Sequence, residues 1–201
     1  MVSVVSLRTF ADAASVPIVI FVDMQREHPA KPRRLAISGI DRALDNCRKV
    51  LDHSRRIGLP VAFIRMLSES AFFNRARPFV RWIKGFEPYR DEMVFERASP
   101  PCYSREPFIA LVSESRGGIL LAEFADESAR LSTLTDAFQR KHKVTYLCDV
   151  SASHAPEDIA ADEIHRAVSK ISELCGEVHG TADWVASALP RKLGNGKNAG
   201  G

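Results

Sequence analysis

Short apolar runs alternate along the chain with segments whose apolar residues recur at helical spacing. The clearest run, Pro17–Asp23, is continuous and rich in β-branched residues, as is typical of a strand covered on both faces of a sheet. Five further strands are expected, at 59–66, 92–97, 119–125, 143–148 and 176–180. Between them lies an irregular segment, 68–90, in which aromatic residues stand among basic ones.

Helices are expected between these strands, at 40–57, 106–115, from 126 onward, at 156–174 and at 182–189. In the third of them, Leu131, Leu134 and Phe138 are expected to form the apolar face. Strands that alternate with helices predict an α/β fold, a Rossmann-like three-layer sandwich in which helices flank a mainly parallel six-stranded sheet. We expect one domain over residues 1–189 and a short basic tail over 190–201.

Composition excludes several classes of protein. The chain has 201 residues, 45% of them hydrophobic and 26% charged, as in an ordinary globular domain. The net charge of +3 comes largely from the tail, and no basic stripe with interleaved aromatic residues indicates a nucleic-acid partner. The longest early apolar run, 16–22, is too short to span a membrane. Four cysteines without a CxxC pair indicate reduced thiols, a cytoplasmic protein and no zinc ribbon.

In open α/β sheets, ligands bind outside the carboxyl ends of the strands. That rule selects Asp23 after the first strand, Arg97 after the third and the turn over 125–130 after the fourth. A partly desolvated aspartate suits general acid or base work, although Asp23 could instead cap the next turn. Arg97 could pair with Asp23, grip a substrate carboxylate or lie on the surface. Asp126 opens a helix, so the amides there could hold an anion, or Asp126 could act only as an N-cap.

Several longer motifs resemble the isochorismatase-like superfamily, also called the cysteine hydrolases. The run that ends in Asp23-Met-Gln25 resembles the family's first strand, and the implied catalytic aspartate is Asp23. Residues 57–65 resemble its second strand, and residues 86–97 resemble the stretch that ends in the family's catalytic lysine, which is Arg97 here. Residues 134–138, 143–149 and 152–153 resemble its "LDAF…V…DA.AS" block, and 181–184 its terminal segment.

The sequence departs from the family at the nucleophile. Counting back from Ala137-Phe138, the position of the family's cysteine falls on Ala129, with Ser128 adjacent. Alanine cannot attack a carbonyl. The resemblance also implies members that hydrolyse a vinyl ether without a thiol, with the aspartate as acid and water attacking. It implies no cofactor, and no counterpart of the family's occasional zinc site is present.

Three hypotheses follow. The first is a small-molecule hydrolase without a cysteine nucleophile, with Asp23 as general acid or base, Arg97 as electrostatic anchor and the amides over 125–129 as an anion cradle. The second is a catalytically degenerate member that binds a small anion or a protein partner. The third is thiol chemistry from a displaced cysteine, Cys102, which lies in the loop after Arg97.

The remaining expectations concern the ligand and the assembly. Trp82 and Tyr103 lie in segments that could line the pocket together with Ala125 and Asp126. Arg97 and the basic cluster over 31–34 favour an anionic small-molecule substrate. The family resemblance implies a homo-oligomer.

Overall fold

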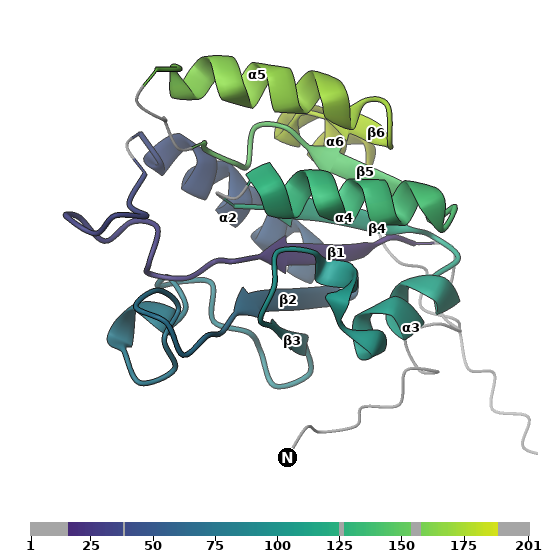
Figure 1. The fold of residues 1–201 in the computed structure, drawn as a ribbon. Coiled ribbons are helices and arrows are strands. Elements are labelled where there is room, and N and C mark those ends of the chain that lie inside the picture. Colours follow the sequence, from purple (N-terminus) through teal and green to yellow (C-terminus); the bar gives the residue numbers. More distant parts are fainter. Residues whose placement is uncertain (1–15, 38, 125–126, 154–157, 189–201) are drawn as a thin grey trace, which may run out of the picture.

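The computed structural model of the chain describes residues 16–37, 39–124, 127–153 and 158–188. Its centre is a six-stranded parallel sheet with the strand order β3-β2-β1-β4-β5-β6 (Figure 1). The strands are β1 (Ile18–Val22), β2 (Val61–Met66), β3 (Met93–Arg97), β4 (Ile119–Glu123), β5 (Val144–Leu147) and β6 (Glu177–His179). The predicted α/β fold and parallel sheet are therefore confirmed.

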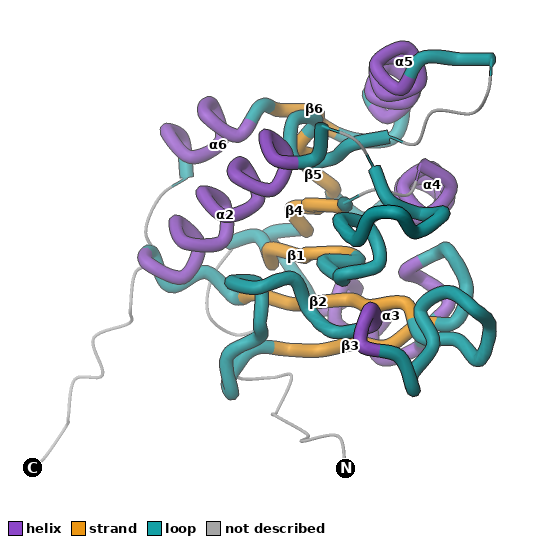
Figure 2. The backbone as a smooth tube through the Cα atoms, turned by 90° about the vertical axis from the view of Figure 1, so that its left-hand side faces the viewer, coloured by secondary structure: helices purple, strands orange, loops and turns teal. Residues whose placement is uncertain are grey.

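Helices cover both faces of the sheet and make it the middle layer of three. As Figure 2 shows, α2 (Asp41–Arg56) and α6 (Thr181–Ser187) lie on one face. On the other face lie α3 (Glu106–Glu114), α4 (Glu127–Gln139) and α5 (Ala161–Ser172). None of the helices in the described part of the chain has both the length and the apolar character that a membrane span requires.

The continuous apolar strands build two cores. Side chains of β1 alternate between the faces, so Val19 and Phe21 join the core under α2 and α6, whereas Ile18, Ile20 and Val22 join the core under α3 and α4. All five residues of β1 are buried, as the two-sided pattern predicted. The sheet is thus anchored on both sides, and its carboxyl edge is held in a fixed position.

Two helix predictions need correction. Phe138 does not lie on the apolar face of α4, because its side chain is 58% exposed. The buried face of α4 consists instead of Ala129, Arg130, Thr133, Leu134 and Ala137. The helix that was expected from residue 156 begins at Ala161, and the described residues just before it are not helical. The shift in the face of α4 matters for function because it brings a charged side chain into the core.

The irregular segment 68–90 packs against the loop that follows β1. Gln25 connects the two, because its side-chain amide donates to the carbonyls of Met66 and Val80 and its oxygen accepts from the Met66 amide. The Ile83 amide donates to the Met24 carbonyl at 2.9 Å. Gln25 therefore has a structural role beside Asp23, because its hydrogen bonds fix the loop after β1 against the segment 68–90.

Candidate functional site

Asp23 lies at the carboxyl end of β1, at the point where the order of the strands reverses between β1 and β4. Its backbone has a positive φ of 58° and its amide donates to the Ile64 carbonyl. This left-handed conformation is uncommon outside glycine, although aspartate and asparagine tolerate it best. The residue is 1% exposed, so the turn places its carboxylate inside the protein.

Arg97, at the carboxyl end of β3, reaches this carboxylate across the intervening strand. Its Nη2 forms an ion pair with Oδ2 of Asp23, and both side chains are almost fully buried. Its Nη1 donates to the carbonyl of Ser99 at 2.7 Å and to that of Pro100. The guanidinium thus places a positive charge directly beside the carboxylate. Of the roles considered for Arg97, the structure shows the pairing with Asp23.

The first turn of α4 lies over the same edge of the sheet. Ala129 is fully buried, whereas Ser128 is exposed. Thr133 lies one turn after Ala129 on the same helix face, and its hydroxyl accepts a hydrogen bond from the Cys102 amide at 3.1 Å. The helix face that carries Ala129 is therefore turned toward the loop after β3, whose carbonyls at residues 99 and 100 accept hydrogen bonds from Arg97. At the position that the family resemblance gives to the nucleophile, alanine has no side-chain group that could attack a substrate.

Cys102 does not replace that nucleophile. Its thiol is buried, and burial raises its pKa strongly, with Glu123 adding to the rise and Arg97 opposing it. A thiol whose pKa is raised this way stays protonated at neutral pH and is a poor nucleophile. The geometry therefore offers no support for the hypothesis of a displaced thiol at this position.

Two buried charged residues on β4 and α4 were not predicted as individual site residues, although Arg130 ends the predicted 125–130 turn. Glu123 ends β4 in register with Val22 and is 0% exposed. Arg130, also 0% exposed, stacks on the ring of Tyr146 at 4.8 Å. A signal for each existed, because Glu123 ends a two-sided apolar strand and Arg130 shares a helix face with Leu134.

The other predicted site residues lie in different surroundings. Trp82 pairs with Gln25 through the backbone, and its ring packs edge-on against Phe63 at 5.5 Å. Tyr103 is buried, and its hydroxyl bonds to His142 beyond the far end of α4. Trp82 is thus beside the loop after Asp23, whereas the ring of Tyr103 points away from it. Ala125 and Asp126 lie outside the described residues.

The basic cluster over 31–34 is only partly available to an anion. Arg33 forms an ion pair with the buried Glu27 at 2.5 Å and stacks on the Phe79 ring at 4.3 Å. Lys31 and Arg34 are exposed. Within the described ranges, no group of three or more histidine, cysteine, aspartate or glutamate residues is arranged to hold a metal ion.

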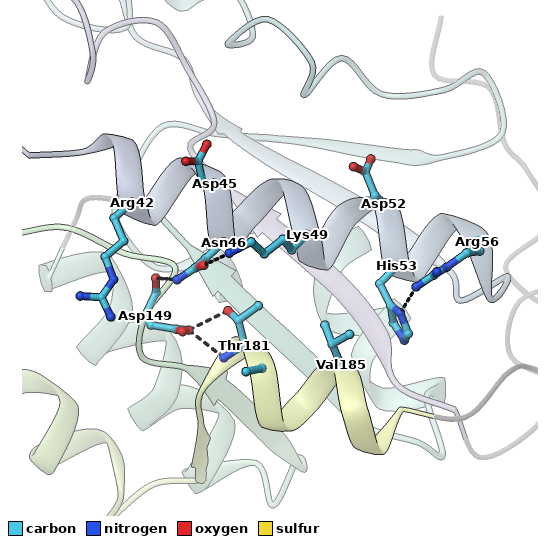
Figure 3. A pocket seen from close by; sticks show the side chains of 11 residues that line it. Arg42, Asp45, Asn46, Lys49, Asp52, His53, Arg56, Asp149, Thr181 and Val185 are labelled. Atoms are coloured by element: carbon cyan, nitrogen blue, oxygen red, sulfur yellow. Dashed lines mark hydrogen bonds between the residues drawn. The ribbon is translucent and has the colours of Figure 1, made fainter.

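A separate groove of about 870 Å³ lies between α2 and α6, on the opposite face of the sheet (Figure 3). At its centre the Asp149 carboxylate accepts hydrogen bonds from the Thr181 amide and hydroxyl, and the Asp149 carbonyl accepts one from Asn46. Its α2 wall carries an alternating series of exposed charged side chains, namely Arg42, Asp45, Lys49, Asp52 and Arg56. These charges lie in solvent, unlike those around Asp23.

The sheet order, with acidic residues at the carboxyl ends of neighbouring strands and a helix that starts above them, defines an α/β protein with a candidate site at the carboxyl edge of its sheet. The sequence matches the family model of the isochorismatase domain over residues 17–183. The chain belongs to the isochorismatase family. No curated protein matches the sequence significantly.

Solved structures give the same fold. An isochorismatase from Pseudomonas putida KT2440 is 26% identical, covers 84% of this chain and 90% of its own, and superposes with a TM-score of 0.75. A cysteine hydrolase from Pseudomonas syringae pv. phaseolicola 1448A is 19% identical, with coverage of 86% and 92% and a TM-score of 0.76. An N-carbamoylsarcosine amidase from Thermoplasma acidophilum is 19% identical, with coverage of 83% and 96% and a TM-score of 0.63.

Proposed function

We propose that this protein is a small-molecule hydrolase that acts without a cysteine nucleophile, with Asp23 as its general acid or base. The observation that carries the proposal is the buried ion pair of Asp23 and Arg97 beneath a helix start that offers no thiol. A carboxylate at this buried edge of the sheet is placed to exchange a proton with a water molecule or a substrate. Water then takes the place of the thiol as the attacking group.

The roles of the other groups follow from their positions. Arg97 holds the aspartate in place and supplies positive charge beside it. We assign to the start of α4 the role of holding an oxyanion or a carboxylate, because the dipole of a helix favours an anion at its N-terminus. With a vinyl ether substrate, Asp23 would act as a general acid: its protonated carboxyl group would donate a proton to the substrate, and water would then attack. The names of the structural relatives make isochorismate and ureido acids the first compounds to test.

A second function, ligand binding without turnover, is favoured by one observation. Asp23 and Arg97 are each 1% exposed, and both terminal nitrogens of Arg97 are bonded within the chain. A catalytic base must meet its substrate or a water molecule. A site in which the charges satisfy one another suits a degenerate family member as well as an enzyme.

The experiment that separates these functions is a turnover screen of the purified protein and of Asp23→Asn. Asparagine tolerates the same backbone conformation but cannot transfer the proton, so we expect a loss of at least about 100-fold. Asp45→Asn, on the exposed surface of α2, is the matched control and should keep full activity. Turnover that survives in Asp23→Asn contradicts the hydrolase proposal, and no turnover of any compound by the wild type favours the binding function.

The oligomeric state and the cellular location of the protein are also inferred. We infer a cytoplasmic homo-oligomer, supported by the family resemblance and the reduced cysteines. Large apolar side chains on α4 and near α5 remain exposed, with Leu174 75%, Phe138 58% and Ile171 47% accessible. Such side chains are typical of interfaces between subunits. Analytical ultracentrifugation of the full chain measures the number of subunits directly.

A further inference from the structure

The two buried arginines at this edge of the sheet differ in what their guanidinium groups contact. Arg97 is engaged by Asp23 and by the carbonyls of the 99–100 loop. Among the described residues, by contrast, none accepts a hydrogen bond from Nε, Nη1 or Nη2 of Arg130. The face of the guanidinium stacks on the ring of Tyr146. The in-plane donors of Arg130 are therefore available, and those of Arg97 are largely used.

Burial makes this difference chemically significant. Arg130 is 0% exposed, and a guanidinium removed from water without acceptors for its donors is costly to the fold. Its fork of N–H groups matches the two oxygens of a carboxylate, which it binds in a bidentate manner. A carboxylate brought by a ligand would supply the acceptors that the described part of the chain does not.

Arg130 also lies close to the site proposed above. It follows Ala129 directly, in the first turn of α4, where the helix dipole favours an anion. Burial raises the pKa of Cys102, and Glu123 adds to this while Arg97 opposes it. Burial likewise raises the pKa of Tyr146, which Arg130 lowers and Glu123 raises. In the sheet, Tyr146 pairs with Leu121 of β4, and Glu123 at the end of that strand pairs with Val22, the residue before Asp23. The ring under Arg130 and the turn at Asp23 are therefore reached from the same strand.

We propose that Arg130, and not Arg97, binds the carboxylate of the ligand at this site. This inference rests on the proposed function at Asp23 and adds the chemical class of the substrate, a small carboxylic acid. Arg97 is then a positioning residue for Asp23, and Arg130 determines specificity. The reacting bond of the substrate lies toward Asp23, with the carboxylate toward Tyr146 and β5.

The test measures binding, so it does not depend on turnover. Formate, acetate and benzoate are titrated into the full-length protein by calorimetry at constant ionic strength, with formamide, acetamide and benzamide as neutral counterparts. We expect at least one carboxylate to bind and its amide not to bind. Arg130→Met should weaken that binding at least about 10-fold, and Arg130→Lys should weaken it less, because lysine keeps the charge but loses the fork. Arg116→Met removes an exposed arginine at the opposite edge of the sheet and should bind as the wild type does.

Thermal unfolding distinguishes a ligand site from a structural role. If Arg130 serves a ligand, free Arg130→Met should melt at the same temperature as the wild type or higher, because an apolar side chain replaces a buried charge. Carboxylate should then raise the melting temperature of the wild type only. The inference is overturned if none of the three carboxylates binds, or if Arg130→Met binds them equally well. Loss of turnover in Asp23→Asn with unchanged binding in Arg130→Met would leave the proposed function standing and remove this inference alone.

Discussion

The charges around Asp23 and the charges in the groove between α2 and α6 belong to the same residue types but lie in different surroundings. Asp23, Glu123, Arg97 and Arg130 are each no more than 1% exposed. The groove charges at Asp45, Lys49 and Arg56 lie in solvent, and Lys49 makes only a hydrogen bond to Asn46. Bulk water screens the second set, whereas the first set lies almost entirely out of contact with bulk solvent. A charged cluster is thus the stronger indication of function where it is buried, and the solvated groove between α2 and α6 is the weaker candidate.

The largest effect should come from breaking the buried pair. Arg97→Met leaves the Asp23 carboxylate without its ion-pair partner in a desolvated position, and this should lower the free energy of unfolding by about 3–5 kcal/mol. The measurement is urea unfolding followed by circular dichroism. The double variant Asp23→Asn/Arg97→Met removes the stranded charge as well, so it should be more stable than Arg97→Met alone. If the double variant were less stable than Arg97→Met, loss of the ion pair would not be the cause of the destabilisation in Arg97→Met.

An intermediate effect is expected on the pH dependence of stability, through His53 in the groove between α2 and α6. Burial lowers the pKa of His53, which packs on Trp184, and Arg56 lowers it further, whereas the Ala188 backbone raises it. As the pH falls below about 6.5, His53 is therefore protonated in the unfolded chain at a higher pH than in the folded chain. Stability should be complete above that pH and fall as the pH decreases. In His53→Gln the decrease between about pH 7.5 and about pH 5.5 should be smaller, and an identical slope in urea unfolding would refute the assignment.

The smallest effect is expected on the α2 wall of the groove. Lys49→Met removes one positive charge, as Arg97→Met does, but from a solvated side chain. The free energy of unfolding should change by less than about 0.5 kcal/mol. A change comparable to that of Arg97→Met would show that burial does not explain the difference between the two regions.

The sheet was largely predictable because its signal is local. Continuous apolar runs marked β1, β2, β4 and β5 to within two residues, since strands buried on both faces tolerate few polar residues. The start of α5 was placed too early, because sequence patterns locate helix ends poorly without a capping motif. Its N-cap position, Ala160, makes no side-chain cap in the structure.

The site was predictable only in part, because its contacts join distant segments. The pairing of Arg97 with Asp23 was one of several alternatives, and only the parallel order of β3, β2 and β1 brings these residues together. Arg130 was overlooked because Leu131 and Phe138 suggested a different face for α4. The periodicity that places Arg130 with Leu134 and Ala137 was present, because these residues are spaced four and seven positions apart along the helix.

The register of the central strands has a consequence for how such a protein can change over time. Val22 pairs with Ile64 on one side and with Glu123 on the other through the backbone. These pairs place the residues after β1 and β4 whatever side chains those residues carry. A lineage can therefore exchange a cysteine for alanine, or a lysine for arginine, while the scaffold stays intact. Inheritance of the architecture and inheritance of the reaction are separable in this family, and each sequence has to be judged by its own side chains.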